Sequence, residues 1–211
     1  MNWKSLAAQL VRARRGARTQ KQLSRELGYQ SNVVFAWENE RDEPNARAFF
    51  RMVQSTGKRG ELSAFKRRDE DLDLSCKEDL TTFLKDLAEK RKVGDLAEQM
   101  QRDRHAVGRW LRGQTEISLG DLLHFVEVTT LGVYDFLAAF VDPCELPEAK
   151  EGYELLAAAR ESARQKPWSH AIVHMVDLPS YQCLKKHESG WFASRLGITT
   201  QDESDCLNLL V

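Results

Sequence analysis

The chain has 211 residues, of which 42% are hydrophobic and 30% are charged, and its net charge is −1. This composition is typical of a globular protein, and no stretch approaches the roughly 18 consecutive apolar residues that a membrane helix needs. The N-terminal segment lacks the uninterrupted apolar run of a signal peptide, so we expect a cytoplasmic protein with no membrane partner.

The charges are distributed unevenly along the chain. Residues 1–60 hold twelve Lys and Arg against five Asp and Glu, residues 61–150 hold thirteen against nineteen, and residues 151–211 hold six against eight. A basic first segment on a nearly neutral chain favours a local contact with a polyanion. The four cysteines form no CxxC pair, which predicts reduced thiols and neither disulfides nor a zinc site.

The first 30 residues contain two helical patterns separated by turn residues. Leu6 and Leu10 fall on one face of a helix that ends near Gly16. Thr19 is a suitable N-cap for a second helix, and Gly28 can adopt the left-handed conformation that stops it. The pattern therefore predicts two short helices that end at glycines.

Two further helices follow before residue 56. Ser31 or Gln30 can cap the third helix, which turns Val34 and Trp37 inward as core residues. Pro44, followed by an asparagine, opens the fourth helix. The pattern predicts a unit of four helices around one apolar centre.

A second copy of this pattern lies 73 residues further along the chain. The two segments align without a gap, and the apolar positions that face inward are kept. The matching pairs are Leu23 and Leu96, Val34 and Val107, Trp37 and Trp110, Phe49 and Leu122, Phe50 and Leu123, and Val53 and Val126. Duplication explains such a run of matches better than chance.

Each copy resembles the helix-turn-helix domain of the Cro and phage-repressor class, often called the XRE type. In the first copy the resemblance rests on Gln20, Leu23, Ser24, Gly28, Val34, Trp37-Glu38-Asn39 and Pro44. The second copy matches more loosely, because Gln101 replaces the turn glycine, Leu111 the acidic residue and Ile117 the proline. Gly113 restores a glycine that is usual after the third helix, where the first copy has Glu40.

The resemblance implies an all-α fold with two tandem helix-turn-helix domains of four or five helices. We expect the first domain at residues 1–57, a charged linker at 58–78, the second domain at 79–141 and a helical C-terminal module at 142–211. The implied function is that of a bacterial or phage transcription regulator. It would bind double-stranded DNA at the nucleoid as a homodimer.

In this class the third helix lies in the major groove of DNA. Carried over by position, the base-facing residues of the first copy are Ser31, Asn32, Phe35 and Ala36. Those of the second copy are Arg104, His105, Gly108 and Arg109, with Arg102 and Arg112 alongside. Asparagine pairs with adenine and arginine with guanine, so the two copies would contact different bases. The alternative for the second copy is a packing or dimerisation surface.

Phosphate contacts are also implied for the first copy. Gln20 and Asn39 match the positions that clamp phosphates in this class. The basic residues of the first helix and its exit would add sequence-independent affinity; they are Arg12, Arg14, Arg15, Arg18 and Lys21. The alternative is a solvated basic face. In the second copy Val93 stands where Gln20 stood, so that clamp is missing.

The C-terminal third predicts further helices, one starting near Tyr153 and one at Pro167. His170 and His174 are four residues apart, but no HExxH pattern accompanies them, so we expect a role in packing or in a surface contact and no metal. The segment from Trp191 onward resembles the helix-turn-helix of winged-helix domains, with Thr200 capping its last helix. Three acidic residues of that helix would repel DNA, so we interpret it as a regulatory or dimerisation element; they are Asp202, Glu203 and Asp205.

No Gly-rich phosphate loop, nucleophile elbow, paired-carboxylate site or metal cluster appears in the sequence, so we expect no enzyme and no cofactor. An unknown effector or protein partner of the C-terminal module stays open. The alternative function is a protein-interaction adaptor, similar to an antirepressor, that uses these folds to bind another regulator or polymerase.

Overall fold

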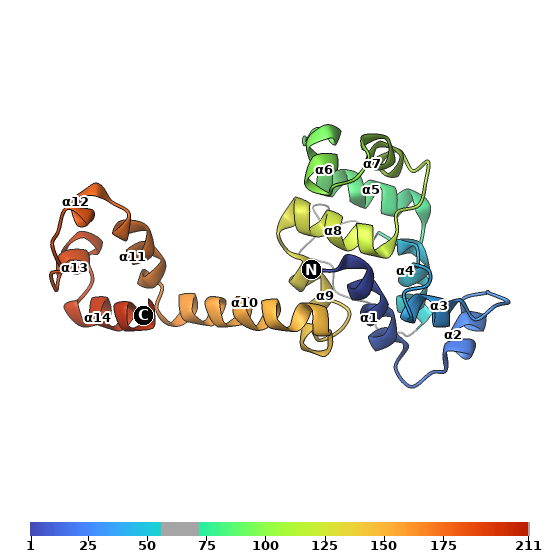
Figure 1. Cartoon of the computed structure of the whole chain (residues 1–211), viewed down its shortest axis with the longest axis horizontal. Coiled ribbons are helices and arrows are strands. Elements are labelled where there is room, and N and C mark those ends of the chain that lie inside the picture. Colours follow the sequence, from blue (N-terminus) through green and yellow to red (C-terminus); the bar gives the residue numbers. More distant parts are fainter. Residues whose placement is uncertain (56–71, 211) are drawn as a thin grey trace. The chain divides into compact units, whose positions relative to one another are not determined.

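The computed structural model describes residues 1–55 and 72–210, and the elements in these ranges are helices (Figure 1). The predicted all-α fold is confirmed. The chain forms two compact units, Met1–Glu151 and Gly152–Val211. None of the described helices is both long and apolar enough to cross a membrane. Most of the predicted linker at 58–78 lies outside the described residues.

The first repeat consists of α1 (Trp3–Arg15), α2 (Gln20–Glu26), α3 (Val33–Glu38) and α4 (Ala46–Ser55). The predicted N-cap Thr19 is confirmed, because its hydroxyl accepts a hydrogen bond from the Gln22 amide. The prediction that Ser31 or Gln30 caps the third helix is wrong. Asn32 does so, because its side-chain oxygen accepts from the amide at the end of the first turn.

The second repeat consists of α5 (Lys77–Ala88), α6 (Val93–Gln99), α7 (Arg104–Leu111) and α8 (Leu119–Thr130). It is followed by α9 (Val133–Ala138) and a 3-10 turn (Pro143–Glu145). A shift of 73 residues carries both ends of α2 onto those of α6, and the start of α4 onto that of α8. The duplication is therefore present in the backbone as well as in the sequence.

The backbone conformation of the turns also matches between the two repeats. Among the described residues, three positions with positive φ match between the repeats even where the residue type has changed. The pairs are Gly16 and Glu89 (59° and 49°), Gly28 and Gln101 (85° and 52°), and Glu40 and Gly113 (56° and 65°). A side chain at such a position costs about 1 kcal/mol relative to glycine, so the turn geometry persists against local preference.

The two repeats share one core. All six predicted pairs of inward-facing residues are buried and belong to a single apolar cluster. Phe140, which follows α9, makes edge contacts with Phe49 of the first repeat and Phe136 of α9, at ring-centroid distances of 5.3 and 5.2 Å. The repeats are thus two halves of one compact unit rather than two separate domains.

A local two-fold axis relates the turns that lead into α4 and α8. Asn45 and Ser118, which are equivalent residues, form an antiparallel bridge. The Ala46 amide donates to the Ile117 carbonyl (2.9 Å), and the Leu119 amide donates to the Pro44 carbonyl (2.8 Å). Each of these bonds becomes the other under the 73-residue shift, as a two-fold axis between the starts of α4 and α8 requires.

Two equivalent glutamates reinforce this axis. The Glu43 carboxylate accepts from the Ser118 hydroxyl (3.0 Å) and the Gly120 amide (2.7 Å). Across the axis, the Glu116 carboxylate accepts from the side chains of Asn45 and Arg47. Each glutamate therefore contacts the same two positions of the opposite repeat.

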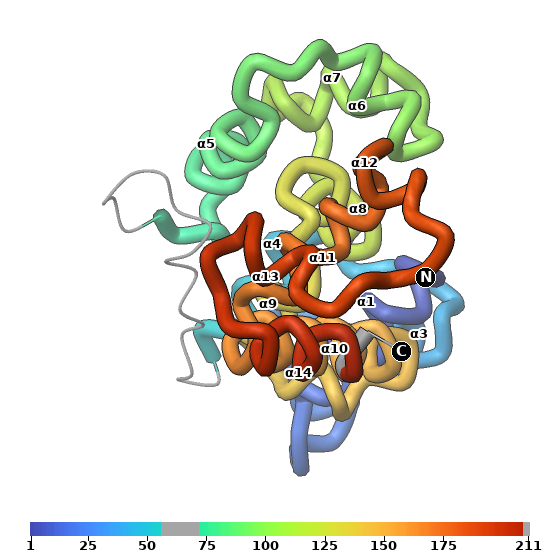
Figure 2. The backbone as a smooth tube through the Cα atoms, turned by 90° about the vertical axis from the view of Figure 1, so that its left-hand side faces the viewer, coloured from blue at the N-terminus to red at the C-terminus, as the bar shows by residue number. Residues whose placement is uncertain are grey.

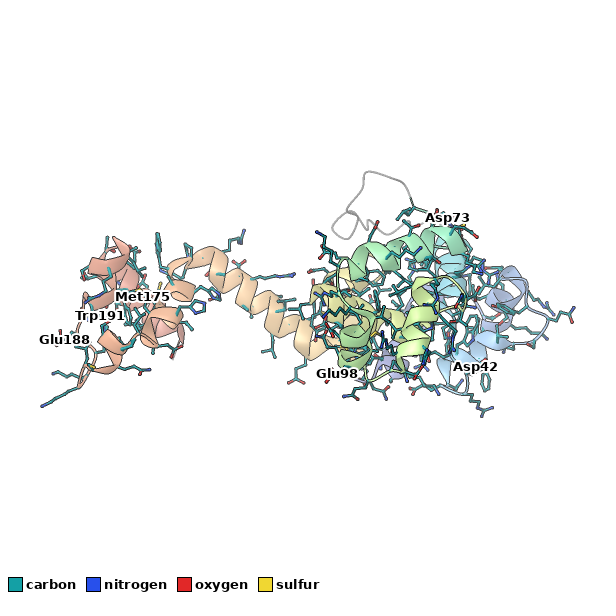
Figure 3. The ribbon with its side chains drawn as sticks, turned by 90° about the horizontal axis from the view of Figure 1, so that it is seen from above. Asp42, Asp73, Glu98, Met175, Glu188 and Trp191 are labelled. Carbon is teal, nitrogen blue, oxygen red and sulfur yellow. The ribbon has the colours of Figure 1, made fainter. Side chains whose placement is uncertain are left out.

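The second unit holds the end of α10 (Pro147–Gln165), α11 (Trp168–Val176), α12 (Pro179–Gln182), α13 (Trp191–Leu196) and α14 (Thr200–Leu210). Ile172, Trp191, Phe192 and Cys206 form its core, against which Met175 packs near Trp191 (Figure 3). The predicted helix start at Pro167 is confirmed.

The cap predicted for the last helix of the second unit is one residue off. Thr199 and not Thr200 caps α14, because its hydroxyl accepts from the Asp202 amide (3.0 Å). The Asp202 carboxylate in turn accepts from the Thr199 amide (3.2 Å). The two residues form a reciprocal cap at the start of the helix.

Candidate DNA-binding surfaces

The outer face of α3 carries the residues that the sequence proposed for it. Val34 and Trp37 are buried, whereas Ser31 and Phe35 are exposed and Ala36 is half-buried. Ser31 has no side-chain hydrogen bond among the described residues, so its hydroxyl can bond to a ligand. The inward residues hold the helix rigidly and leave this face open.

Asn32 is exposed, but its acceptor is already used. Its Oδ1 accepts from the Phe35 amide (3.4 Å) and from the Ser24 hydroxyl (3.2 Å). Bidentate pairing with adenine needs both the oxygen and the nitrogen of the amide. Such pairing would release the N-cap of α3, which costs about 1 kcal/mol. Only the Nδ2 donor of Asn32 is therefore available at no cost to the helix.

Phe35 has a neighbour that the sequence did not suggest. The side chain is 39% exposed, and the Arg41 guanidinium lies over its ring, 5.1 Å from the centroid. This cation–π contact holds a positive charge beside the outer face of α3. A cation three residues after the end of the helix is the only signal for it in the sequence.

Glu38, at the end of α3, engages three of the predicted phosphate contacts. Its carboxylate is only 2% exposed and accepts from Arg15 Nε (2.6 Å) and Gln20 Nε2 (2.5 Å). Arg12 Nη2 donates to the Glu38 carbonyl (2.9 Å). A buried carboxylate requires such partners, so these side chains serve the fold. Asn39 Nδ2 is likewise engaged, because it donates to the Phe35 carbonyl (2.8 Å).

The predicted phosphate contact of Arg14 is wrong. The residue is 8% exposed, its Nη1 donates to the Phe140 carbonyl (3.1 Å), and burial together with nearby Arg18 lowers its pKa. Arg18 pairs with Glu26 (2.9 Å) and donates to carbonyl groups at the end of α1. Of the predicted cations of this repeat, Lys21 is exposed and has no side-chain partner among the described residues.

The corresponding helix of the second repeat is capped differently. Asp103 caps α7 by accepting from the amides of His105 (2.8 Å) and Ala106 (3.1 Å). Asp103 is not one of the predicted contact residues, so the side chains of those residues are not needed to cap the helix. Arg104, His105 and Arg109 are exposed, and their side chains have no hydrogen-bond or ion-pair partner among the described residues.

These side chains border a pocket of about 400 Å³ beside the start of α6. Its lining consists of Val93, Arg104, His105, Gly108 and Arg112. Arg112 lies across α7 at Gly108, where an added Cβ would come within 3.1 Å of Nη1. The equivalent position in the first repeat is Phe35, so the missing side chain makes room for a guanidinium. Two arginines and a histidine around one concavity suit a phosphate or the edge of a guanine.

Arg102, which the sequence placed beside this group, is committed elsewhere. Its Nε donates to the Asp121 carboxylate (2.7 Å). The cationic surface of the second repeat therefore consists of the residues that follow the cap of α7.

The second unit contains one buried polar cluster that the sequence did not reveal. Glu203 is 1% exposed and accepts from the amides of Phe192 (3.3 Å) and Ala193 (3.1 Å), so it caps the start of α13. Its carboxylate also lies 3.3 Å from His187 Nε2, and His187 Nδ1 lies 3.1 Å from the Tyr181 hydroxyl. This cluster joins α12, α13 and α14.

The histidines of α11 show no ligand set. The rings of His170 and His174 lie edge to face at 5.2 Å, and both residues are exposed. Within residues 1–55 and 72–210, no group of three or more His, Cys, Asp or Glu is placed to hold a metal ion. Asp205, the third acidic residue of the last helix, pairs with Lys166 (2.6 Å).

Comparisons with known proteins give no relative to argue from. A scan against protein-family models, a search of curated proteins and a search of solved structures each found no match. The functional argument therefore rests on the chemistry of α3 and α7 and on their arrangement.

Proposed function

We propose that the protein is a transcription regulator that binds duplex DNA sequence-specifically through α3 and α7. The observation that carries this proposal is the outer face of α7. Arg104, His105 and Arg109 are exposed there and have no side-chain partner within the described part of the chain, on a helix held by the buried Val107 and Trp110. A rigid helix with free guanidinium groups suits the major groove, where arginine is the commonest specific partner of guanine.

The first repeat supports the same function with weaker groups. Ser31 bonds to several bases, and Phe35 and Ala36 offer apolar contacts that suit a thymine methyl. Lys21 and Arg41 are the exposed cations that flank this surface. Phosphate binding in this repeat then rests on these two residues, because most of the predicted α1 contacts are used within the protein.

The test is selection of the purified chain from random duplex DNA, followed by a salt titration on the enriched sequence. We expect one defined motif that contains guanine. The logarithm of the binding constant should fall with the logarithm of salt concentration, with a slope of about −0.9 for each phosphate contact. Weak binding that is equal for all duplexes would contradict the proposal.

A protein-interaction adaptor is the second candidate, and the state of α1 favours it. The basic balance of residues 1–60 is not a free positive surface, because Arg14, Arg15 and Arg18 are engaged within the protein. The adaptor predicts that selection enriches no motif. It also predicts that Arg104→Ala with Arg109→Ala leaves the residual DNA binding unchanged within about twofold.

A further inference from the structure

The local two-fold axis has a consequence for how DNA is bound, if the proposed function holds. An operation that exchanges the two repeats also exchanges α3 and α7. In both views α7 lies at the top of the first unit and α3 in its lower part, with α4 and α8 at heights between them (Figures 1 and 2). Two base-contacting helices related by a two-fold axis are what a helix-turn-helix dimer presents to successive turns of the major groove.

One residue next to each motif lies on the same side of the first unit. Asp42, which follows α3, and Glu98, on α6, lie along one edge in Figure 3, and Asp73, which precedes α5, lies on the opposite edge. The first edge therefore presents parts of both helix-turn-helix motifs, while the other holds the entry to the second repeat. One straight duplex along the first edge would meet both motifs.

The arrangement is held rigidly. The repeats share a core through Phe49, Phe136 and Phe140. In addition, hydrogen bonds of Glu43 and Glu116 join the start of α4 to the start of α8. Two domains on a flexible linker would tolerate many spacings between their sites, whereas a shared core fixes one.

The axis relates positions but not residue types. Equivalent contact positions hold Ser31 and Arg104, Asn32 and His105, Phe35 and Gly108, Ala36 and Arg109, and Asn39 and Arg112. The contact residues of α3 are neutral, whereas those of α7 include two exposed arginines, Arg104 and Arg109. The two halves of the DNA site must therefore differ in sequence although they are inverted in orientation.

We infer that a single chain acts as its own dimer and binds one inverted pair of unlike half-sites. The α7 half-site contains guanine and the α3 half-site is rich in A·T pairs. Their centres are separated by about 10 base pairs, one turn of the duplex. The homodimer expected from the sequence is not needed to match a two-fold site, because both halves belong to one chain.

The first experiment measures stoichiometry and contacts on the duplex enriched by the whole chain. Native mass spectrometry should give one chain per duplex. Base-modification interference should give two patches about one turn apart, with the strongest guanine signal in only one of them. Arg104→Ala with Arg109→Ala should abolish that guanine signal and leave the other patch. Arg164→Ala, an exposed arginine of α10, is the matched control and should change neither patch.

The second experiment tests rigidity. Five base pairs inserted between the patches rotate one half-site by about half a turn, and we expect affinity to fall about 100-fold or more. The same insertion outside the motif should have no effect. A palindromic motif bound by two chains, or tolerance of the central insertion, would overturn this inference and leave the proposed function standing. Absence of any motif would overturn both.

Discussion

The two repeats have the same backbone but use their polar groups in opposite ways. In the first repeat, two polar residues that carry the family resemblance bond within the protein: Gln20 to Glu38, and Asn39 to the Phe35 carbonyl. In the second repeat the resemblance is looser, yet the cations of α7 have no partners among the described residues. Resemblance in this chain follows the residues that stabilise the fold more closely than those available to a ligand.

Position 38 and its equivalent explain much of this difference. Glu38 draws Arg15 and Gln20 inward, whereas the second repeat has the half-buried Leu111 at the same place. With no buried carboxylate to satisfy, the second repeat needs no internal arginine partner at this point. The positions equivalent to Arg15 and Gln20 accordingly hold Ala88 and Val93, which have no polar side chain.

The largest expected effect is therefore the loss of Glu38. Glu38→Ala would leave Arg15 and Gln20 without their buried partner, and we expect the free energy of unfolding to fall by about 4 kcal/mol. Urea denaturation followed by circular dichroism measures this. Glu26→Ala removes a more exposed partner of Arg18 and should cost less than about 1 kcal/mol. Equal losses in the two variants would show that the Glu38 cluster does not distinguish the repeats.

The second effect concerns DNA and compares α7 with α3. Arg104→Ala with Arg109→Ala should weaken binding to the enriched duplex about 100-fold, since each arginine–guanine pair contributes roughly 1–3 kcal/mol. Ser31→Ala, which removes a neutral donor at the position equivalent to Arg104, should weaken it about threefold. Fluorescence anisotropy on labelled duplex gives both values. A larger loss for Ser31→Ala would reverse the assignment of the stronger half-site.

The sequence predicted what local chemistry decides. Turn residues such as Thr19 and Gly28 mark helix ends because caps and left-handed turns involve only neighbouring residues. The core pairs followed from helical periodicity. The internal hydrogen bonds of Arg14 and Arg15 could not be predicted in this way. Their partners, Phe140 after α9 and Glu38 of α3, lie next to α1 only in the folded chain.

The two-fold axis was also not predicted from the sequence, although one pair of matching residues takes part in it. Glu43 and Glu116 are equivalent acidic residues just before α4 and α8, and each bonds across the axis. Helical periodicity does not detect this match, because both glutamates lie outside the helices. Only the contact of one repeat with the other gives them a role.

A third prediction tests the shared turn geometry. Gln101 and Gly28 are equivalent and both have positive φ. Gln101→Gly should stabilise the protein by up to about 1 kcal/mol, because glycine adopts this conformation without steric cost. Gly28→Ala should destabilise it by about 1 kcal/mol for the same reason. Thermal unfolding of both variants measures the two changes in stability, which should have opposite signs. Destabilisation by Gln101→Gly would argue against equivalent turns.

The smallest effect lies where the two-fold relation fails. Trp3 of α1 stacks on His124 of α8, with ring centroids 4.8 Å apart. The equivalent pair across the axis is Cys76 and Arg51, which have no rings to stack. This contact therefore fixes α1 against α8 on one side only, and it introduces a titratable group there.

Burial lowers the pKa of His124 below its ordinary value of 6.5; Arg102 adds to this effect, and Asp121 and Glu127 oppose it. The unfolded chain then binds a proton that the folded chain does not. The resulting stability is complete above about pH 6.5 and is lost as the pH falls through the unfolded pKa toward the folded one. His124→Phe keeps a ring against Trp3 and removes the titration. Urea unfolding between pH 7.5 and 5.5 should therefore show a shallower loss of stability in this variant than in the unmodified chain, and parallel curves would place the pH dependence elsewhere.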